Sequence, residues 1–197
     1  PNQMTVRGES FDSFDLDDFV SDADHPDSVI NWAATGETNF TVSINSENVV
    51  TIQVNDTNFV GSDTVTFTAT DPDGFSDSDE AIFAVQPPQV TFTQIQQNIF
   101  NQSCAFSGCH DGGSNQLPGV MDLREGMAFQ SIVNVQSIEI PQLNRVEPGQ
   151  PDSSYIVWKI EGRQGIQGQR MPLGGSPLSQ EKINMMRDWI LNGAPNN

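Results

Sequence analysis

The chain has 197 residues, enough for two domains of about 100 residues each, and a formal net charge of −18. Most of this charge lies in the first part, because residues 1–87 contain 17 acidic side chains and one arginine, whereas residues 88–197 contain 9 acidic and 7 basic ones. So acidic a segment repels phosphate backbones and anionic lipids, which argues against binding of nucleic acid or membrane surfaces. No run approaches the roughly 20 apolar residues that span a bilayer, so no membrane insertion is expected.

Residues 10–85 show apolar side chains at every second position. In "DTVTFTAT", Val65 and Phe67 alternate with threonines, and "NVVTIQV" repeats the pattern. Alternation of this kind predicts half-buried β-strands, and the breaks between the runs are rich in turn-forming residues. About seven short strands at this spacing predict an all-β antiparallel sandwich.

The pattern changes after "VQPPQV", where two consecutive prolines interrupt any strand ladder. We therefore predict two domains, residues 1–87 and 88–197. Apolar side chains at helical spacing follow in "TFTQIQQNIFNQSC", with Thr91 or Thr93 as N-cap, and in "SPLSQEKINMMRDWILNGAP", with Ser179 as N-cap. Two terminal helices around a Gly- and Pro-rich middle predict a small, mainly α domain that is short of core, for which a bound cofactor would supply apolar filling.

A single loop, "CAFSGCH", contains both cysteines of the chain and one of its two histidines. A disulfide between Cys104 and Cys109 would close so short a loop that it stabilises little, and it leaves His110 without a role. A zinc site would need further ligands, and the other histidine, His25, lies in the other segment. Covalent haem attachment uses all three residues, although the usual signature has a two-residue spacer; Gly108 gives the longer spacer flexibility.

A haem held in this way can take a second axial ligand, and methionine is a common one. The candidates are Met121, Met127, Met171, Met185 and Met186. Met185 and Met186 lie in the last predicted helix, where core packing explains them. Met171 differs because "GQRMPLGG" has no periodicity, which makes it the preferred candidate for the ligand; the alternative is a methionine that caps a small apolar patch.

The second half resembles the small monohaem c-type cytochrome domains of bacteria that use a C-x4-C-H motif. The stretches that carry the resemblance are "IFNQSCAFSGCHDG", "LPGVMDL", "RVEPGQPDSSYIVWKIEG", "RMPLGG" and "LSQEKINMMRDWILNGAP". It implies one haem c, with thioether bonds to Cys104 and Cys109 and iron ligation by His110 and Met171. It also implies that Arg145 faces a propionate and that Tyr155 or Trp158 packs at the haem edge.

The first half resembles bacterial cadherin-like or immunoglobulin-like repeats of large surface proteins, from "PNQMTVRGESFDSFDLDDFVSDADHPDSVINW" to "FVGSDTVTFTATDPDGFSDSDEAIFAV". The resemblance suggests a piece of a longer chain with upstream repeats. It also implies that the acidic loops lie close together, where carboxylate oxygens suit calcium. The expected calcium ligands are Asp22, Asp24, Asp71 and Asp73, with Asp17, Asp18 and Asp77 as additions. Asp is also a standard turn residue, so these loops can form without metal, and His25 is expected to be polar surface.

Together these features predict an exported, non-enzymatic electron-transfer protein, located in the periplasm, at the cell surface or outside the cell. It would exchange electrons with a redox partner protein or an extracellular acceptor. The alternative is a structural, adhesive or filament-forming module, in which the haem domain is secondary or forms a haem chain by self-assembly. A peroxidase is a third reading, which would need an open iron site and is disfavoured by Met171.

Overall fold

A computed structural model describes residues 1–112 and 121–197, and it divides the chain into two compact units, Pro1–Pro88 and Gln89–Asn197. The division falls one residue from the boundary expected at the two prolines. Each unit has its own hydrophobic core, and the two cores share no residue. Among the described residues, the helices are too short or too polar to cross a lipid bilayer.

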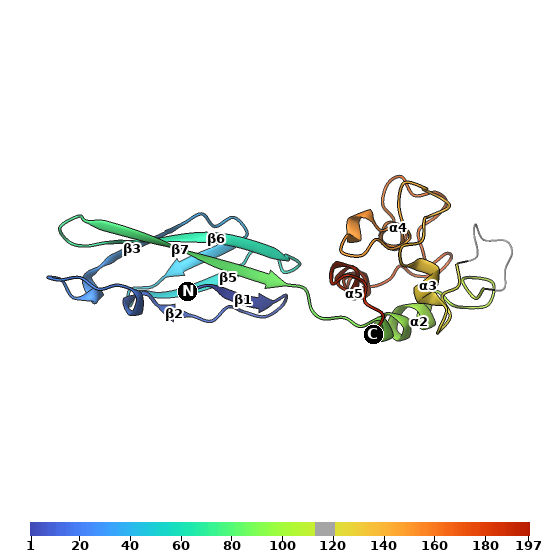
Figure 1. Cartoon of the computed structure of the whole chain (residues 1–197), viewed down its shortest axis with the longest axis horizontal. Helices are drawn as coiled ribbons and strands as arrows, with labels where there is room; N and C mark the ends of the chain where they lie inside the picture. The colour runs from blue at the N-terminus through green and yellow to red at the C-terminus, as the bar shows by residue number, and fades with distance from the viewer. Residues whose placement is uncertain (113–120) are drawn as a thin grey trace. The chain divides into compact units, whose positions relative to one another are not determined.

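The first unit contains seven strands in two sheets (Figure 1). One sheet has the order β1-β7-β6-β3 and the other the order β2-β5-β4. Neighbouring strands are antiparallel except for β1 and β7, which run parallel. The elements of this unit are β1 (Gln3–Val6), β2 (Phe14–Asp15), the 3-10 helices η1 (Leu16–Phe19) and η2 (Asp27–Val29), β3 (Asn31–Thr35), β4 (Phe40–Ile44), β5 (Val49–Val54), β6 (Gly61–Thr70) and β7 (Ser76–Gln86).

The core of the first unit lies between the two sheets. Val65 and Phe67 of β6 and Phe83 of β7 meet Phe40 of β4 and Val50 of β5 there. Aromatic rings dominate the packing, since the Phe83 ring centroid lies 5.6 Å from that of Phe11 and 6.4 Å from that of Phe67. The alternation seen in the sequence thus places every second side chain of these strands in the core.

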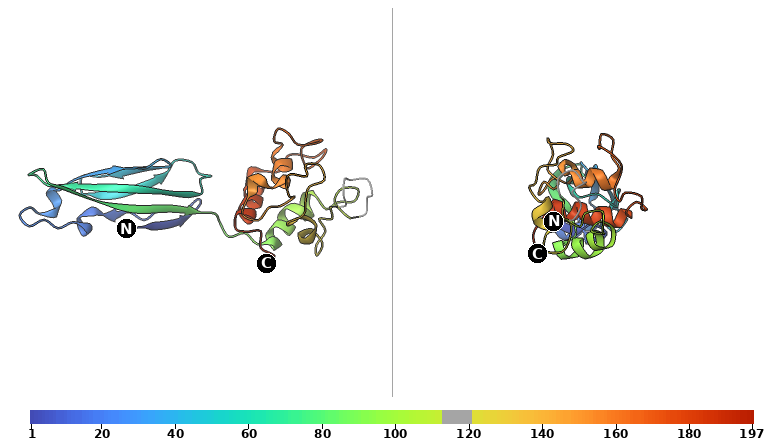
Figure 2. Two further views of the ribbon diagram at one scale, coloured as in Figure 1. Left: turned by 45° about the horizontal axis from the view of Figure 1, so that its top comes forward. Right: turned by 90° about the vertical axis from the view of Figure 1, so that its right-hand side faces the viewer.

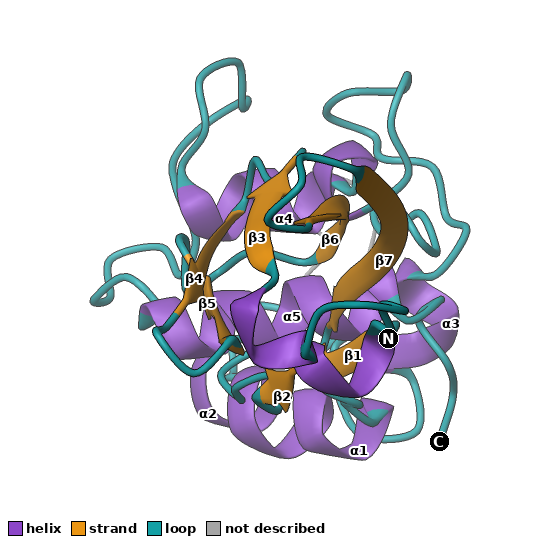
Figure 3. Cartoon of the chain, turned by 90° about the vertical axis from the view of Figure 1, so that its left-hand side faces the viewer, coloured by secondary structure: helices purple, strands orange, loops and turns teal. Residues whose placement is uncertain are grey.

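The second unit contains helices joined by long irregular segments, which are teal in Figure 3. Its first helices form one continuous run, green in Figure 2. Only isolated β-bridges occur in the described part of this unit, such as Val133 with Val146. The elements are α1 (Phe92–Ile95), the π-helical stretch η3 (Gln96–Phe100), α2 (Asn101–Ser103), α3 (Ala128–Ile132), the 3-10 helix η4 (Pro151–Ser153), α4 (Tyr155–Glu161) and α5 (Gln180–Leu191).

The predicted fold class, an all-β immunoglobulin/cadherin-like sandwich followed by a mainly α cytochrome c-like domain, is wrong. The chain is mixed α/β, and helices cover well under half of the described residues of the second unit. One reason is that α4 stops after seven residues at Gly162, whose φ of 72° is a left-handed conformation that ends a helix. The following segment to Ser179 then lacks regular structure and forms part of a cavity wall instead.

Two capped helical runs hold the second unit together. The first begins at Thr91, whose side chain accepts a hydrogen bond from the Gln94 backbone while the Gln94 side chain bonds back to Thr91. The second, α5, begins at Ser179. Ile99 of the first run packs in one core cluster with Met186 and Trp189 of α5, and all three are fully buried.

Candidate functional site

The loop that contains both cysteines follows directly after α2 and is closed by its own backbone. The Cys104 amide still donates to the Phe100 carbonyl at 2.9 Å, as in a helix, and the His110 amide donates back to the Cys104 carbonyl at 3.2 Å. Both cysteines are free thiols. The loop therefore holds the two thiols and the imidazole in one compact turn without a disulfide.

A cavity of about 410 Å³ opens beside this loop. Cys104, Cys109 and His110 line it together with Met171, which comes from the segment between α4 and α5. The remaining wall is mostly apolar and includes side chains of both helical runs, such as Ile99 and Met186. The cavity wall thus contains all four residues that the sequence analysis selected, three from this loop and Met171 from a distant segment. The expected "LPGV" stretch, residues 117–120, lies outside the described residues.

Burial favours the neutral forms of two groups of the loop, the His110 imidazole and the Cys104 thiol. Burial lowers the pKa of His110, with the Met121 backbone acting in the opposite direction. The His110 Nδ1 atom is buried and has no hydrogen-bond partner among the described residues. Burial raises the pKa of Cys104 to about 12, so this thiol stays protonated at neutral pH. A neutral imidazole is the form that binds a metal ion.

One side of the cavity carries a hydrogen-bonded polar cluster formed by Glu139, Tyr155 and Lys159. The Tyr155 hydroxyl donates to Glu139 Oε2 at 2.5 Å, and Lys159 Nζ donates to the same oxygen at 3.1 Å. Lys159 Nζ also donates to the Gln167 carbonyl at 2.7 Å, so this buried ammonium group is paired. Burial, followed by the bond to Glu139, raises the pKa of Tyr155 to about 12.

Sequence reasoning missed Glu139 and Lys159 in this cluster. A signal was present for Lys159, because it follows Tyr155 by four residues on α4 and therefore lies on the same helical face. No comparable signal identified Glu139, which lies in an irregular segment.

The other residues expected around the haem lie in different places. Arg145 lines the cavity, where burial lowers its pKa, and its Nη1 donates to the Ser131 carbonyl at 2.7 Å. Trp158 is not part of the cavity wall; its indole NH donates to the Asp152 carbonyl at 2.7 Å, and Arg163 lies over its ring.

Met121 and Met186 line the cavity as well as Met171, whereas Met127 is half-exposed and does not line it.

The four aspartates expected to bind calcium lie near one another in the first unit. Ligand atoms of Asp22 and Asp71 gather within 4.8 Å around His25, and those of Asp24 and Asp73 form a second such group with the same histidine. Asp17, Asp18 and Asp77 belong to neither group in the described part of the chain. The structure thus brings the two acidic loops together and adds an imidazole, which sequence reasoning had assigned to the polar surface. Calcium binding itself stays a prediction.

No known protein family matches the chain, and no curated protein sequence matches it.

Proposed function

We propose that the chain is an exported electron-transfer protein that carries one covalently bound haem c in its second unit. The observation that supports this best is that Cys104, Cys109, His110 and Met171 line one apolar cavity. When bound, haem supplies an iron atom that gains and loses one electron. Such a protein transfers electrons without making or breaking a substrate bond, so its proposed function is not enzymatic.

The residues present fit this group. A cavity of about 410 Å³ is in the range of pockets that enclose a cofactor, and its mainly apolar wall suits a flat, apolar macrocycle. The buried Nδ1 atom of His110 has no partner among the described residues, so the ring is not committed to another interaction at that atom. Cys104 and Cys109, which would form the thioether bonds, are both free thiols in the cavity wall.

Each residue has a distinct role in the proposal. The thiols of Cys104 and Cys109 would add across two vinyl groups, forming thioether bonds with no leaving group. His110, whose pKa is lowered by burial, would hold the haem iron through its imidazole. Met171 would be the second ligand of the iron, and its soft thioether favours the ferrous state. Arg145, which lines the cavity, would face a propionate.

The same proposal implies a location and a kind of partner. Covalent haem attachment of this type takes place outside the cytoplasm, so we place the protein in the periplasm, at the cell surface or outside the cell. Phe106, Ile138 and Leu173 line the cavity and are each at least half exposed, which gives its mouth an apolar rim. A redox partner protein or an extracellular acceptor would approach this rim.

The test is to express the chain in a host that attaches haem c, and to record its mass and its optical spectrum after reduction. We expect the mass of one added haem and sharp cytochrome bands. Replacing both cysteines, Cys104→Ala with Cys109→Ala, should abolish the added mass, whereas Met127→Ala should leave it unchanged. A folded chain with neither added mass nor bands contradicts the proposal and favours a structural or adhesive module.

A further inference from the structure

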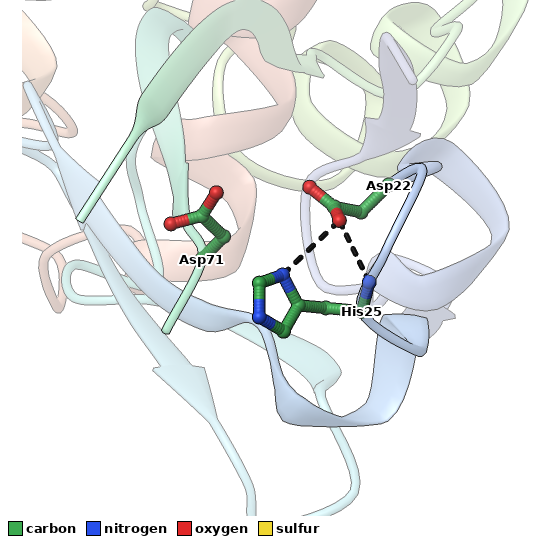
Figure 4. Close-up of side chains that lie close together, drawn as sticks. All are labelled: Asp22, His25 and Asp71. Atoms are coloured by element: carbon green, nitrogen blue, oxygen red, sulfur yellow. Dashed lines mark hydrogen bonds and ion pairs between the residues drawn. The ribbon is translucent and has the colours of Figure 1, made fainter. Parts of the chain in front are cut away.

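His25 lies between two acidic loops that are far apart in the sequence. One loop precedes η2 and contributes Asp22 and Asp24; the other joins β6 to β7 and contributes Asp71 and Asp73. Figure 4 shows the imidazole between the carboxylates of Asp22 and Asp71. The side chain of His25 is only 21% exposed, and that of Asp22 only 22%.

The fold brings these loops together. Strand β3 pairs with β6 in antiparallel register, with Asn31 opposite Thr70, so the segment before β3 and the segment after β6 meet at the same end of the sheet. The backbone then fixes both inner carboxylates. Asp22 Oδ1 accepts hydrogen bonds from the Asp24 and His25 amides, and Asp71 Oδ1 accepts one from the Phe75 amide.

Distances within the cluster match those between ligands of a small metal ion. The His25 Nδ1 atom lies 3.2 Å from Asp22 Oδ1, and one ligand atom each of Asp22, His25 and Asp71 lie within 4.8 Å of one another. Tetrahedral ligands about 2.1 Å from a zinc ion are about 3.4 Å apart. The three groups are therefore close enough together to share one ion.

The chemistry of the three groups selects among cations. Calcium and magnesium take oxygen ligands, whereas a set that contains an imidazole nitrogen suits zinc and other divalent transition metals. Two carboxylates also balance the charge of a divalent ion.

We propose that Asp22, His25 and Asp71 bind a divalent transition metal ion of the zinc class. Three protein ligands leave further coordination positions of the ion to water. Asp24 and Asp73, which are more exposed, also lie near the His25 imidazole and are close enough to approach an ion bound there. The site is independent of the haem proposal, since all of its ligands lie in the first unit. The nitrogen ligand is what distinguishes it from the calcium site expected from the aspartates alone.

The experiment uses the full chain with Cys104→Ser and Cys109→Ser, so that thiols do not compete for the metal. Because the chain has two histidines, the ring ¹⁵N signals of His25 are assigned by comparison with His25→Asn. Addition of Zn²⁺ should shift the His25 signals and give one binding site by calorimetry, and Ca²⁺ should not shift them. Asp71→Asn should weaken zinc binding about tenfold or more, while it keeps the oxygen that accepts from Phe75.

Asp79→Asn is the matched control, because it removes one exposed carboxylate of β7 outside the cluster. It should leave zinc affinity within about twofold. Three results would overturn the proposal: His25 signals that Zn²⁺ leaves unmoved, equal losses of affinity in Asp71→Asn and Asp79→Asn, or Ca²⁺ binding that is tighter than Zn²⁺ binding and unaffected by His25→Asn. Circular dichroism spectra that match the parent chain establish that each variant is folded.

Discussion

Tyr155 is the only tyrosine of the chain, and it lies in the wall of the cavity. Because burial raises its pKa from an ordinary value of 10.0 to about 12, the folded state holds the phenol proton more tightly than the unfolded state does. The contribution of Tyr155 to stability is therefore complete below pH 10 and is lost as the pH rises from about 10 to about 12.

We predict that tyrosinate absorbance of the folded protein appears near pH 12, and that in denaturant it appears near pH 10. The single tyrosine makes the signal unambiguous. Tyr155→Phe should remove this part of the alkaline loss of stability, measured as the free energy of unfolding against pH. A folded-state titration near 10 would show that the hydroxyl is not held by burial and Glu139.

In the proposed function Met171 is the methionine ligand of the haem iron, but Met121 and Met186 line the same cavity. In the haem-loaded protein, Met171→Ala should abolish the weak near-infrared absorption band that methionine ligation gives to the ferric form. Met127→Ala, outside the cavity, should leave the band unchanged. If the band survives Met171→Ala and is lost in Met121→Ala or Met186→Ala, the ligand is that residue instead.

At the residue scale, the sequence predicted the candidate site best where chemistry is rare. Two cysteines and a histidine within seven residues have few alternative explanations, and Met171 was separable from Met185 and Met186 because it lies outside the last predicted helix. Glu139 and Lys159 were missed because charged residues are usually exposed. The place of His25 depends on the pairing of β3 with β6, which brings Asp71 near, and single-residue patterns do not reveal such pairing.

At the scale of elements, the loop after α2 depends on two glycines with left-handed backbone. Gly108 has a φ of 82° and open space where a Cβ would lie. Gly112 has a φ of 70°, but a Cβ there would lie 2.7 Å from the Arg124 guanidinium and even closer to the Asp122 carboxylate, which are paired with each other. The Asp122–Arg124 pair therefore packs directly against the backbone that follows His110.

We predict that Gly112→Ala lowers the free energy of unfolding more than Gly108→Ala does. Both variants carry the cost of a left-handed non-glycine residue, about 1–2 kcal/mol, and only Gly112→Ala adds a steric clash. Chemical denaturation of the two variants measures the difference. Equal losses would mean that Asp122 and Arg124 move aside at no cost.

The helices show why the fold class of the second unit was mispredicted. The periodicity of Ile95, Ile99 and Met186 belongs to helical segments that the structure contains, and Thr91 and Ser179 cap them. Between them, however, apolar side chains such as Leu123, Ile138 and Met171 converge on a cavity from irregular segments. Apolar side chains that line a cavity from irregular segments do not repeat at helical spacing, so sequence periodicity does not reveal them.

At the scale of the whole molecule, the two units have separate cores. Phe83 is fully buried among aromatic rings in the first, and Ile95 is fully buried in the second. Phe83→Ala should cost about 3–5 kcal/mol and Ile95→Val about 0.5–1.5 kcal/mol. The Phe83→Ala substitution should lower the stability of the first unit alone, and Ile95→Val that of the second unit alone.

We therefore expect two calorimetric transitions, of which Phe83→Ala moves one and Ile95→Val the other. Haem content and the Tyr155 titration should be unaffected by Phe83→Ala, because both belong to the second unit. A single transition, or two that move together in either variant, would contradict separate folding. Phe83→Leu, with a smaller loss, provides the same comparison if the alanine variant does not fold.

The parallel pairing of β1 with β7 has a mechanical consequence. Residues Gln3–Val6 lie in register with Phe83–Gln86, and the two strands point the same way. A pulling force applied to the start of β1 and to the end of β7 acts in opposite directions along the two strands. It therefore shears the four residue pairs together, since none can separate before the others slide. Shearing four pairs at once requires more force than separating them one after another, so this pairing favours resistance to tension along the strands.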